Sequence, residues 1–99
     1  MDKPKFTWDI KKNAMNKAKH GISFEEGETV FYDHYARLIP DPEHSEYEER
    51  FILLGISSQL RMLIVCHCYR EDGQTIRIIS TRKANKFEQQ QYKGFRYER

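Results

Sequence analysis

Three strand-like runs separated by short turn signals occupy the second half of the sequence, and they constrain the fold more than any other feature. The runs are residues 50–56, 61–70 and 75–82. Asp72-Gly73 is a strong two-residue turn signal between the last two runs, and residues 57–59 give a weaker signal between the first two. Because such short turns join antiparallel neighbours, the sequence predicts an antiparallel sheet.

The last run combines apolar β-branched residues with cations. Regular alternation predicts that Arg77 shares a face with Ile79 and Thr81, and that Arg82 lies on the other face with Ile76, Ile78 and Ser80. An arginine among isoleucines is costly unless it reaches solvent, a carboxylate or an anionic ligand. A packed Arg-Glu pair and a phosphate contact are therefore both open for these two arginines.

The turn signals also predict which residues of neighbouring strands lie opposite one another. A turn at Asp72-Gly73 places Cys68 opposite Arg77 and Leu63 opposite Arg82. A two-residue turn at residues 58–59 places Arg50 opposite His67, on the face of Ile78 and Arg82.

Helix signals flank the predicted sheet. Asp9 is placed to cap a helix that runs to about His20 and ends at Gly21, and Ile10, Ala14 and Ala18 form a narrow apolar stripe on it. Ser23 and Glu26 form a capping box that opens a second short helix, and Asn85 and Glu88 form another, for a helix that ends at Gly94. A short strand is expected at residues 5–8 and another at 36–39. The expected fold is α+β, with an antiparallel sheet, two N-terminal helices and a short C-terminal helix.

The length and composition bound the architecture. A chain of 99 residues predicts one domain, 1–99, with residues 1–4 and 94–99 as loose termini. No apolar run approaches membrane-spanning length and the start lacks a secretory signal, so we expect a cytoplasmic protein without membrane association. Cys66 and Cys68 point to one face of a strand and are expected to be reduced, with no metal site, because no second Cys or His pair has zinc spacing. No cofactor-binding motif is present.

The formal net charge of +2 conceals a strong segregation. Residues 1–22 carry six basic against two acidic residues, residues 23–49 carry one against nine, and residues 75–99 carry seven against two. Basic ends that meet in the fold would form a surface for polyanions, and basic ends that stay apart would be solvated faces.

This inventory suits metal-independent RNA cleavage, in which a 2′-hydroxyl attacks the adjacent phosphate. The reaction needs cations for the phosphate, and Arg50, Arg77 and Arg82 are candidates. It also needs proton-transfer groups, for which His20, His67, Lys19 and Tyr92 qualify by chemistry. His20 suits a simple C-terminal helix cap better than a catalytic role. The same cations serve plain phosphate binding, so a noncatalytic nucleic-acid-binding module and a protein-interaction module stay open.

A series of residues along nearly the whole chain resembles the BrnT toxin family. It begins with Trp8, Asp9, Lys12, Asn16, Lys19, His20, Gly21, Phe24, Glu25 and Glu26, and continues with Glu49, Arg50, Phe51 and Gly55. It ends with Ile76, Arg77, Ile78, Ile79, Ser80, Arg82, Lys83, Ala84, Glu88 and Tyr92. Each motif is weak alone, and their order and spacing together are specific.

The resemblance implies a RelE-like ribonuclease fold without a cofactor, a toxin that cleaves RNA and inhibits translation, and neutralisation by a BrnA-like antitoxin. It also implies that operator DNA is contacted only through the antitoxin. The matching residues expected to be catalytic are His20, Arg50, Arg77, Arg82 and Lys19. Those expected to bind RNA are Lys12, Asn16, Ser80, Lys83 and Tyr92.

Two positions depart from the family pattern. Thr81 and Gly27 each stand where alanine is expected. Glycine weakens the second helix by up to about 1 kcal/mol relative to alanine, and neither change replaces a candidate catalytic group.

Overall fold

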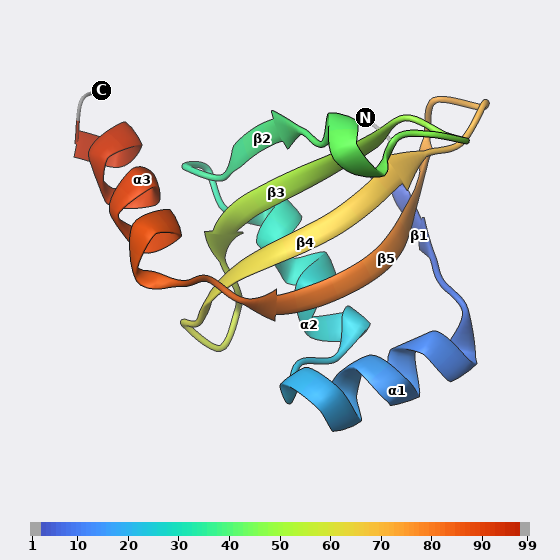
Figure 1. Ribbon diagram of the computed structural model, residues 1–99, viewed down its shortest axis with the longest axis horizontal. Coiled ribbons are helices and arrows are strands. Elements are labelled where there is room, and N and C mark those ends of the chain that lie inside the picture. The colour runs from blue at the N-terminus through green and yellow to red at the C-terminus, as the bar shows by residue number, and fades with distance from the viewer. Residues whose placement is uncertain (1–2, 98–99) are drawn as a thin grey trace.

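The computed structural model describes residues 3–97 and has the expected α+β architecture (Figure 1). The elements follow in the order β1 (Lys5–Thr7), α1 (Ile10–His20), α2 (Phe24–Thr29), the 3-10 helix η1 (Val30–Tyr32), β2 (Arg37–Pro40), the 3-10 helix η2 (Pro42–His44), β3 (Arg50–Ile56), β4 (Met62–Tyr69), β5 (Thr75–Lys83) and α3 (Lys86–Tyr97). The three long strands fall on the three runs predicted from the sequence.

The five strands form one sheet in the order β1-β5-β4-β3-β2. β1 pairs with β5 in parallel, and the other neighbours are antiparallel. In Figure 1, α2 lies behind β3 and β4, while α1 lies beyond β5 and α3 lies at the opposite side of the view. The face of the sheet turned away from α2 therefore has no helix across its centre.

The main hydrophobic core lies between the sheet and the segment α2-η1. Its buried residues are Ile22, Phe24, Val30, Leu53, Leu63, Val65 and Ile78. A smaller core on the other face joins Tyr92 of α3 to Leu54, Ile64 and Ala84. Burial of apolar side chains on both faces explains why the central strands hold a fixed register.

The predicted caps of α1 form, but its buried face differs from the expected apolar stripe. Asp9 accepts a hydrogen bond from Lys12 N at 3.0 Å, and Gly21 closes the helix in the left-handed conformation at φ 75°. Ile10 is 82% exposed, and the residue that α1 buries is Asn16. The helix is thus held to the sheet by a polar contact instead of by the stripe.

Glu26 forms only half of the predicted capping box. Ser23 Oγ accepts from Glu26 N at 3.1 Å, but the Glu26 carboxylate binds Arg61 and accepts from Ser57 Oγ at 2.7 Å. Hydrogen bonds from Arg61 hold the pKa of buried Glu26 below its usual value, although burial acts in the other direction. This carboxylate fastens α2 to the β3-β4 turn.

The capping box of α3 is complete, but the predicted end of this helix is wrong. Glu88 N donates to Asn85 Oδ1 and Asn85 N donates to Glu88 Oε1, both at 2.8 Å. The helix continues through Gly94 to Tyr97, because one glycine weakens a helix without interrupting its hydrogen bonds. Of the termini expected to be loose, residues 1–2 and 98–99 lie outside the described residues.

Candidate functional site

A β-bulge in β5 changes the face to which its arginines point. Cys68 pairs with Arg77 and His67 with Ile78, but the next partner of β4, Cys66, pairs with Ser80, so Ile79 is an extra residue. The extra residue reverses the alternation beyond it. The expectation that Arg77 and Arg82 lie on opposite faces is therefore wrong, since both lie on the face turned away from α2.

The β3-β4 turn corrects the predicted position of Arg50. Ser57 N donates to Arg61 O at 2.8 Å, which leaves a three-residue loop closed by Leu60 in the left-handed conformation at φ 62°. The expected two-residue turn is thus wrong by one residue. Arg50 pairs with Cys68 instead of with His67.

These two irregularities gather cations on one surface. Arg50, Cys68 and Arg77 form a row across three strands, and Ser80 and Arg82 follow along β5 on the same side. We call this surface the arginine face, defined by Arg50, Ile52, Cys66, Cys68, Arg77, Ser80 and Arg82. Apart from buried Cys68, all of these side chains are partly exposed.

The three arginines of this face differ in their partners. Arg82 donates to both oxygens of Glu88, at 2.9 and 2.8 Å. Arg50 donates through Nε and Nη2 to Glu48 Oε2, both at 3.2 Å. Arg77 forms no ion pair within residues 3–97. Of the two alternatives raised by the sequence, Arg82 forms the Arg-Glu pair and Arg77 is available to an anion.

The Arg82-Glu88 pair also anchors α3 electrostatically. Hydrogen bonds from Arg82 are the largest cause that lowers the pKa of Glu88, and a backbone hydrogen bond from Asn85 adds to it. The same pairing raises the pKa of Arg82. The pair therefore connects the C-terminal end of β5 to the start of α3 through charge-assisted hydrogen bonds.

The candidates on α1 lie apart from the arginine face. α1 packs against β5 and α2, and Asn16 forms hydrogen bonds from α1 to β5. Asn16 Nδ2 donates to Thr81 O at 2.9 Å, and Thr81 N donates to Asn16 Oδ1 at 3.2 Å. The amide thus pairs with the edge of β5 as a neighbouring strand would. Lys12 and Lys19 are exposed on this helix, and His20 is half-buried at its end.

Two further candidates point elsewhere. Lys83 pairs with Leu63, on the α2 side of the sheet, and its charge acts on Glu26. His67 is fully buried on that same side, in edge contact with Phe31, and burial lowers the pKa of its imidazole. His67 is therefore a core residue and cannot reach an RNA phosphate.

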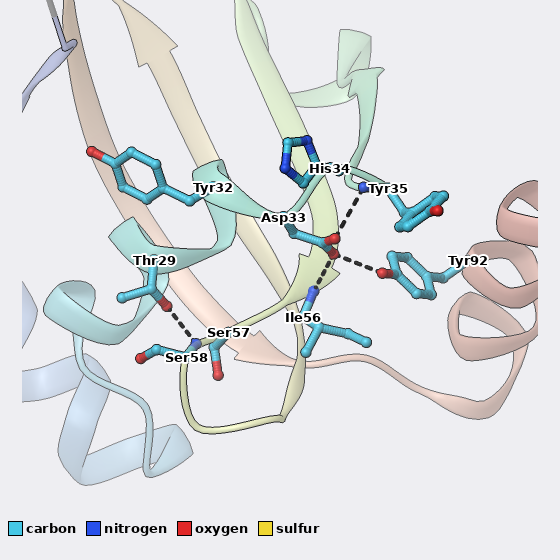
Figure 2. A pocket seen from close by; sticks show the side chains of 9 residues that line it. All are labelled: Thr29, Tyr32, Asp33, His34, Tyr35, Ile56, Ser57, Ser58 and Tyr92. Carbon is cyan, nitrogen blue, oxygen red and sulfur yellow. Dashed lines mark hydrogen bonds between the residues drawn. The ribbon is translucent and has the colours of Figure 1, made fainter.

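Tyr92 belongs to the smaller core, but its hydroxyl reaches a pocket of about 590 Å³ (Figure 2). The hydroxyl donates to Asp33 Oδ2 at 2.7 Å, and the same oxygen accepts from Ile56 N at 2.8 Å. The residues that line the pocket are Thr29, Tyr32, Asp33, His34, Tyr35, Ile56, Ser57, Ser58 and Tyr92. The sequence did not predict this pocket, since its walls come from segments far apart in the chain, among them α2, the end of β3 and α3.

Glu48 lies beside the arginine face as the partner of Arg50, and sequence reasoning passed over it. It lies in the acidic segment 43–49, which the sequence marks only by its composition. Its carboxylate holds Arg50 and acts on the Cys68 thiol, whose pKa is raised by burial and then by Glu48. The segment therefore brings a carboxylate next to Arg50 and Cys68.

Neither a metal cluster nor a membrane-spanning helix occurs in the described part of the chain. Residues 3–97 contain no group of three or more His, Cys, Asp or Glu side chains that could hold a metal ion. Within the same residues, every helix is too short or too polar to cross a membrane.

The arrangement of cations and carboxylates on an open sheet suits phosphate chemistry, and comparison with known proteins fixes the class. A family model described as the ribonuclease toxin BrnT of type II toxin-antitoxin systems matches residues 8–88. The chain belongs to the BrnT family. It is thus a ribonuclease toxin whose family implies an RNA substrate and an antitoxin partner.

A solved BrnT structure has the same fold. The crystal structure of the Brucella abortus ribonuclease toxin BrnT superposes with a TM-score of 0.65 at 25% identity, over 84% of this chain and 99% of that chain. A search of curated proteins finds no match. The resemblance inferred from the sequence and the expected fold class are both confirmed.

Proposed function

We propose that this BrnT protein cleaves RNA without a metal ion, by attack of a 2′-hydroxyl on the adjacent phosphate, with that phosphate on the arginine face. The observation that carries the proposal is the row of Arg50, Cys68 and Arg77. Two strand spacings separate the backbones of the two arginines, about 10 Å, so their long side chains can approach one phosphate from both sides. Fixed guanidinium groups stabilise the charge that develops on phosphate oxygens.

The carboxylates on Arg50 and Arg82 are compatible with this role. The Arg50 side chain is 34% exposed and the Arg82 side chain 41%, and ion pairs at such positions contribute about 0–1 kcal/mol. An RNA phosphate can therefore compete for the same guanidinium N–H groups. Ser80 lies between Arg77 and Arg82 on this face, and its hydroxyl can donate a hydrogen bond to the RNA backbone.

The predicted site residues outside the arginine face are proposed to have supporting roles. The sequence predicted catalysis for Lys19 and His20. Since α1 lies apart from the arginine face, we propose instead that these two residues contact the RNA away from the cleaved phosphate, and that Lys12 and Lys83 hold more distant phosphates. Asn16 and Tyr92 are buried and hydrogen-bonded, which supports an effect on RNA through the position of α1 and α3.

The biological setting follows from the family. We propose that RNA cleavage inhibits translation in the cytoplasm, that a BrnA-like antitoxin neutralises the toxin, and that operator DNA is contacted only through the antitoxin. An antitoxin that covers the arginine face would bind less tightly as the salt concentration rises, because exposed charges are screened.

The test is cleavage of a labelled RNA in excess chelator, with Arg77→Ala beside the wild-type protein. We expect wild-type cleavage to persist, to give 2′,3′-cyclic phosphate ends, and to fall about 100-fold or more in the variant. Lys11→Ala removes one exposed positive charge elsewhere and should stay within about twofold.

Three results would contradict the proposal. These are wild-type cleavage that stops with chelator and returns with magnesium, an Arg77→Ala variant as active as Lys11→Ala, and salt-sensitive RNA binding without cleavage. The last result would favour a noncatalytic binding module.

A further inference from the structure

Cleavage by a 2′-hydroxyl requires a group that takes up the hydroxyl proton, and the arginine face has few that qualify. Arginine stays charged and cannot accept a proton. Cys68 is only 3% exposed, and burial raises the pKa of its thiol. Cys66 packs against the core below α3. Within residues 3–97, the carboxylates that bind an arginine of this face directly are those of Glu48 and Glu88.

The two carboxylates differ in how many of their oxygens are already occupied by hydrogen bonds. Both oxygens of Glu88 accept from Arg82, and Oε1 also accepts from Asn85 N, so this side chain is committed to the start of α3. Glu48 accepts both Arg50 bonds on a single oxygen, Oε2, and its other neighbour is the weak donor Cys68. The Glu48 side chain is 37% exposed, so substrate can reach it.

The position of Glu48 matches the reaction. Glu48 binds Arg50 directly, and it also raises the pKa of the neighbouring Cys68 thiol, which Arg77 lowers from the next strand. The carboxylate therefore lies close to Arg50 and Cys68, two members of the row that ends at Arg77. A phosphate held by Arg50 and Arg77 would bring its neighbouring ribose close to Glu48.

The charges around Glu48 come from its own segment and from two strands. Glu43, His44 and Glu46 line a pocket of about 210 Å³ with Glu48, Tyr47 and Arg50. His44 is turned to Asp41, with Nδ1 at 2.9 Å from Oδ2. Arg77 in β5 and Arg70, directly after β4, both lower the pKa of the Cys68 thiol beside Glu48.

From these contacts we infer that Glu48 is the proton acceptor of the cleavage reaction. The inference rests on the proposed placement of RNA on the arginine face. The 2′-oxygen forms a bond to phosphorus while its proton passes to the Glu48 carboxylate. The bond between phosphorus and the 5′-oxygen then breaks, and this oxygen takes a proton from water. The products are a 2′,3′-cyclic phosphate and a 5′-hydroxyl end.

A rival role makes the opposite prediction. If Glu48 only neutralises Arg50 until RNA displaces it, removing its charge would expose Arg50 and raise RNA affinity and cleavage. Glu48→Gln keeps the shape of the side chain and separates the two roles.

The experiment compares cleavage rates at saturating RNA from pH 4 to pH 8 for wild type, Glu48→Gln and Glu48→Asp. We expect Glu48→Gln to lower kcat about 100-fold or more, and to lose the rise in rate with pH on the acidic side of the wild-type profile. Glu48→Asp keeps a carboxylate and should keep that rise at a lower rate. Glu71→Gln, an equal charge change in the exposed β4-β5 turn, should match wild type.

Each other outcome overturns the inference. Glu48→Gln that is as active as wild type or more active would favour the rival role. A slow Glu48→Gln variant that retains the acidic rise would show that Glu48 acts only on structure, and unfolding midpoints of the three proteins detect a folding defect. If wild-type cleavage needs magnesium, the metal-independent proposal fails separately, and the same comparison is made with magnesium present.

Discussion

Gly27 of α2 and Thr81 of β5 contact each other under the sheet, and they are the two positions where the chain departs from the alanines expected for the family. A Cβ at Gly27 would lie 2.5 Å from Thr81 Cγ2. The threonine cannot rotate its methyl away at low cost, because its Oγ1 accepts from Asn16 Nδ2 at 2.7 Å and donates to Ile22 O at 3.2 Å. We predict that the two substitutions compensate each other.

The magnitude follows from two opposing effects. Gly27→Ala gains up to about 1 kcal/mol of helix stability and loses about 1–3 kcal/mol by overpacking, so it should destabilise the protein by about 1 kcal/mol. Thr81→Ala should cost about 1–2 kcal/mol through its lost hydroxyl contacts. In the double variant the new Cβ enters the space of the missing methyl, so Gly27→Ala should stabilise that background by up to about 1 kcal/mol. The expected coupling is about 2 kcal/mol.

The assay is urea unfolding of all four proteins, followed by circular dichroism, with the free energy of unfolding taken from midpoint and slope. The Thr81→Ala protein should become more stable when Gly27→Ala is added, and the wild type less stable. Free energies that add within about 0.5 kcal/mol would refute the steric explanation.

Two further predictions concern buried polar groups. Asn16→Ala should lower the free energy of unfolding by about 2–4 kcal/mol, because it leaves the Thr81 backbone unpaired at a buried edge; a urea midpoint equal to that of Lys11→Ala would contradict this. The pKa of Glu26 is lowered by Arg61 from 4.5, so its stabilisation is fully present above that value and is lost as pH falls through the folded pKa. Glu26→Gln should therefore lose less stability than wild type between pH 5 and pH 3 in urea titrations, and parallel losses would show that this carboxylate is not coupled to folding.

The sequence predicted the elements and caps because these depend on local chemistry. The three central strands, the Asp9 and Gly21 caps of α1 and the Asn85-Glu88 box are set by residues within a few positions of one another. The faces of β5 could not be predicted beyond Ile79, because a bulge inside an apolar run carries no composition signal. Leu60 gave no turn signal either, since left-handed backbone usually selects glycine or asparagine.

The same limits apply to the site. Regular alternation separates Arg77 from Arg82. The three-residue β3-β4 loop places Arg50 on the side of Arg77, and the bulge in β5 brings Arg82 to that side as well. Glu48 is one of several acidic residues in a segment without periodicity. Its interaction with Cys68 of β4 depends on the tertiary fold and could not be predicted from the sequence. Asn16 has the spacing of a surface residue on a polar flank, yet it is the residue that α1 buries.

The most direct test of the central claim is an NMR titration of the arginine Nε–Hε signals with a short RNA that carries 2′-deoxy substitutions and cannot be cleaved. The account predicts that the signals of Arg50, Arg77 and Arg82 shift together at the lowest RNA concentrations, and that the Arg61 signal, fixed on Glu26, does not. Shifts confined to α1, with the three arginine signals unmoved, would contradict the account.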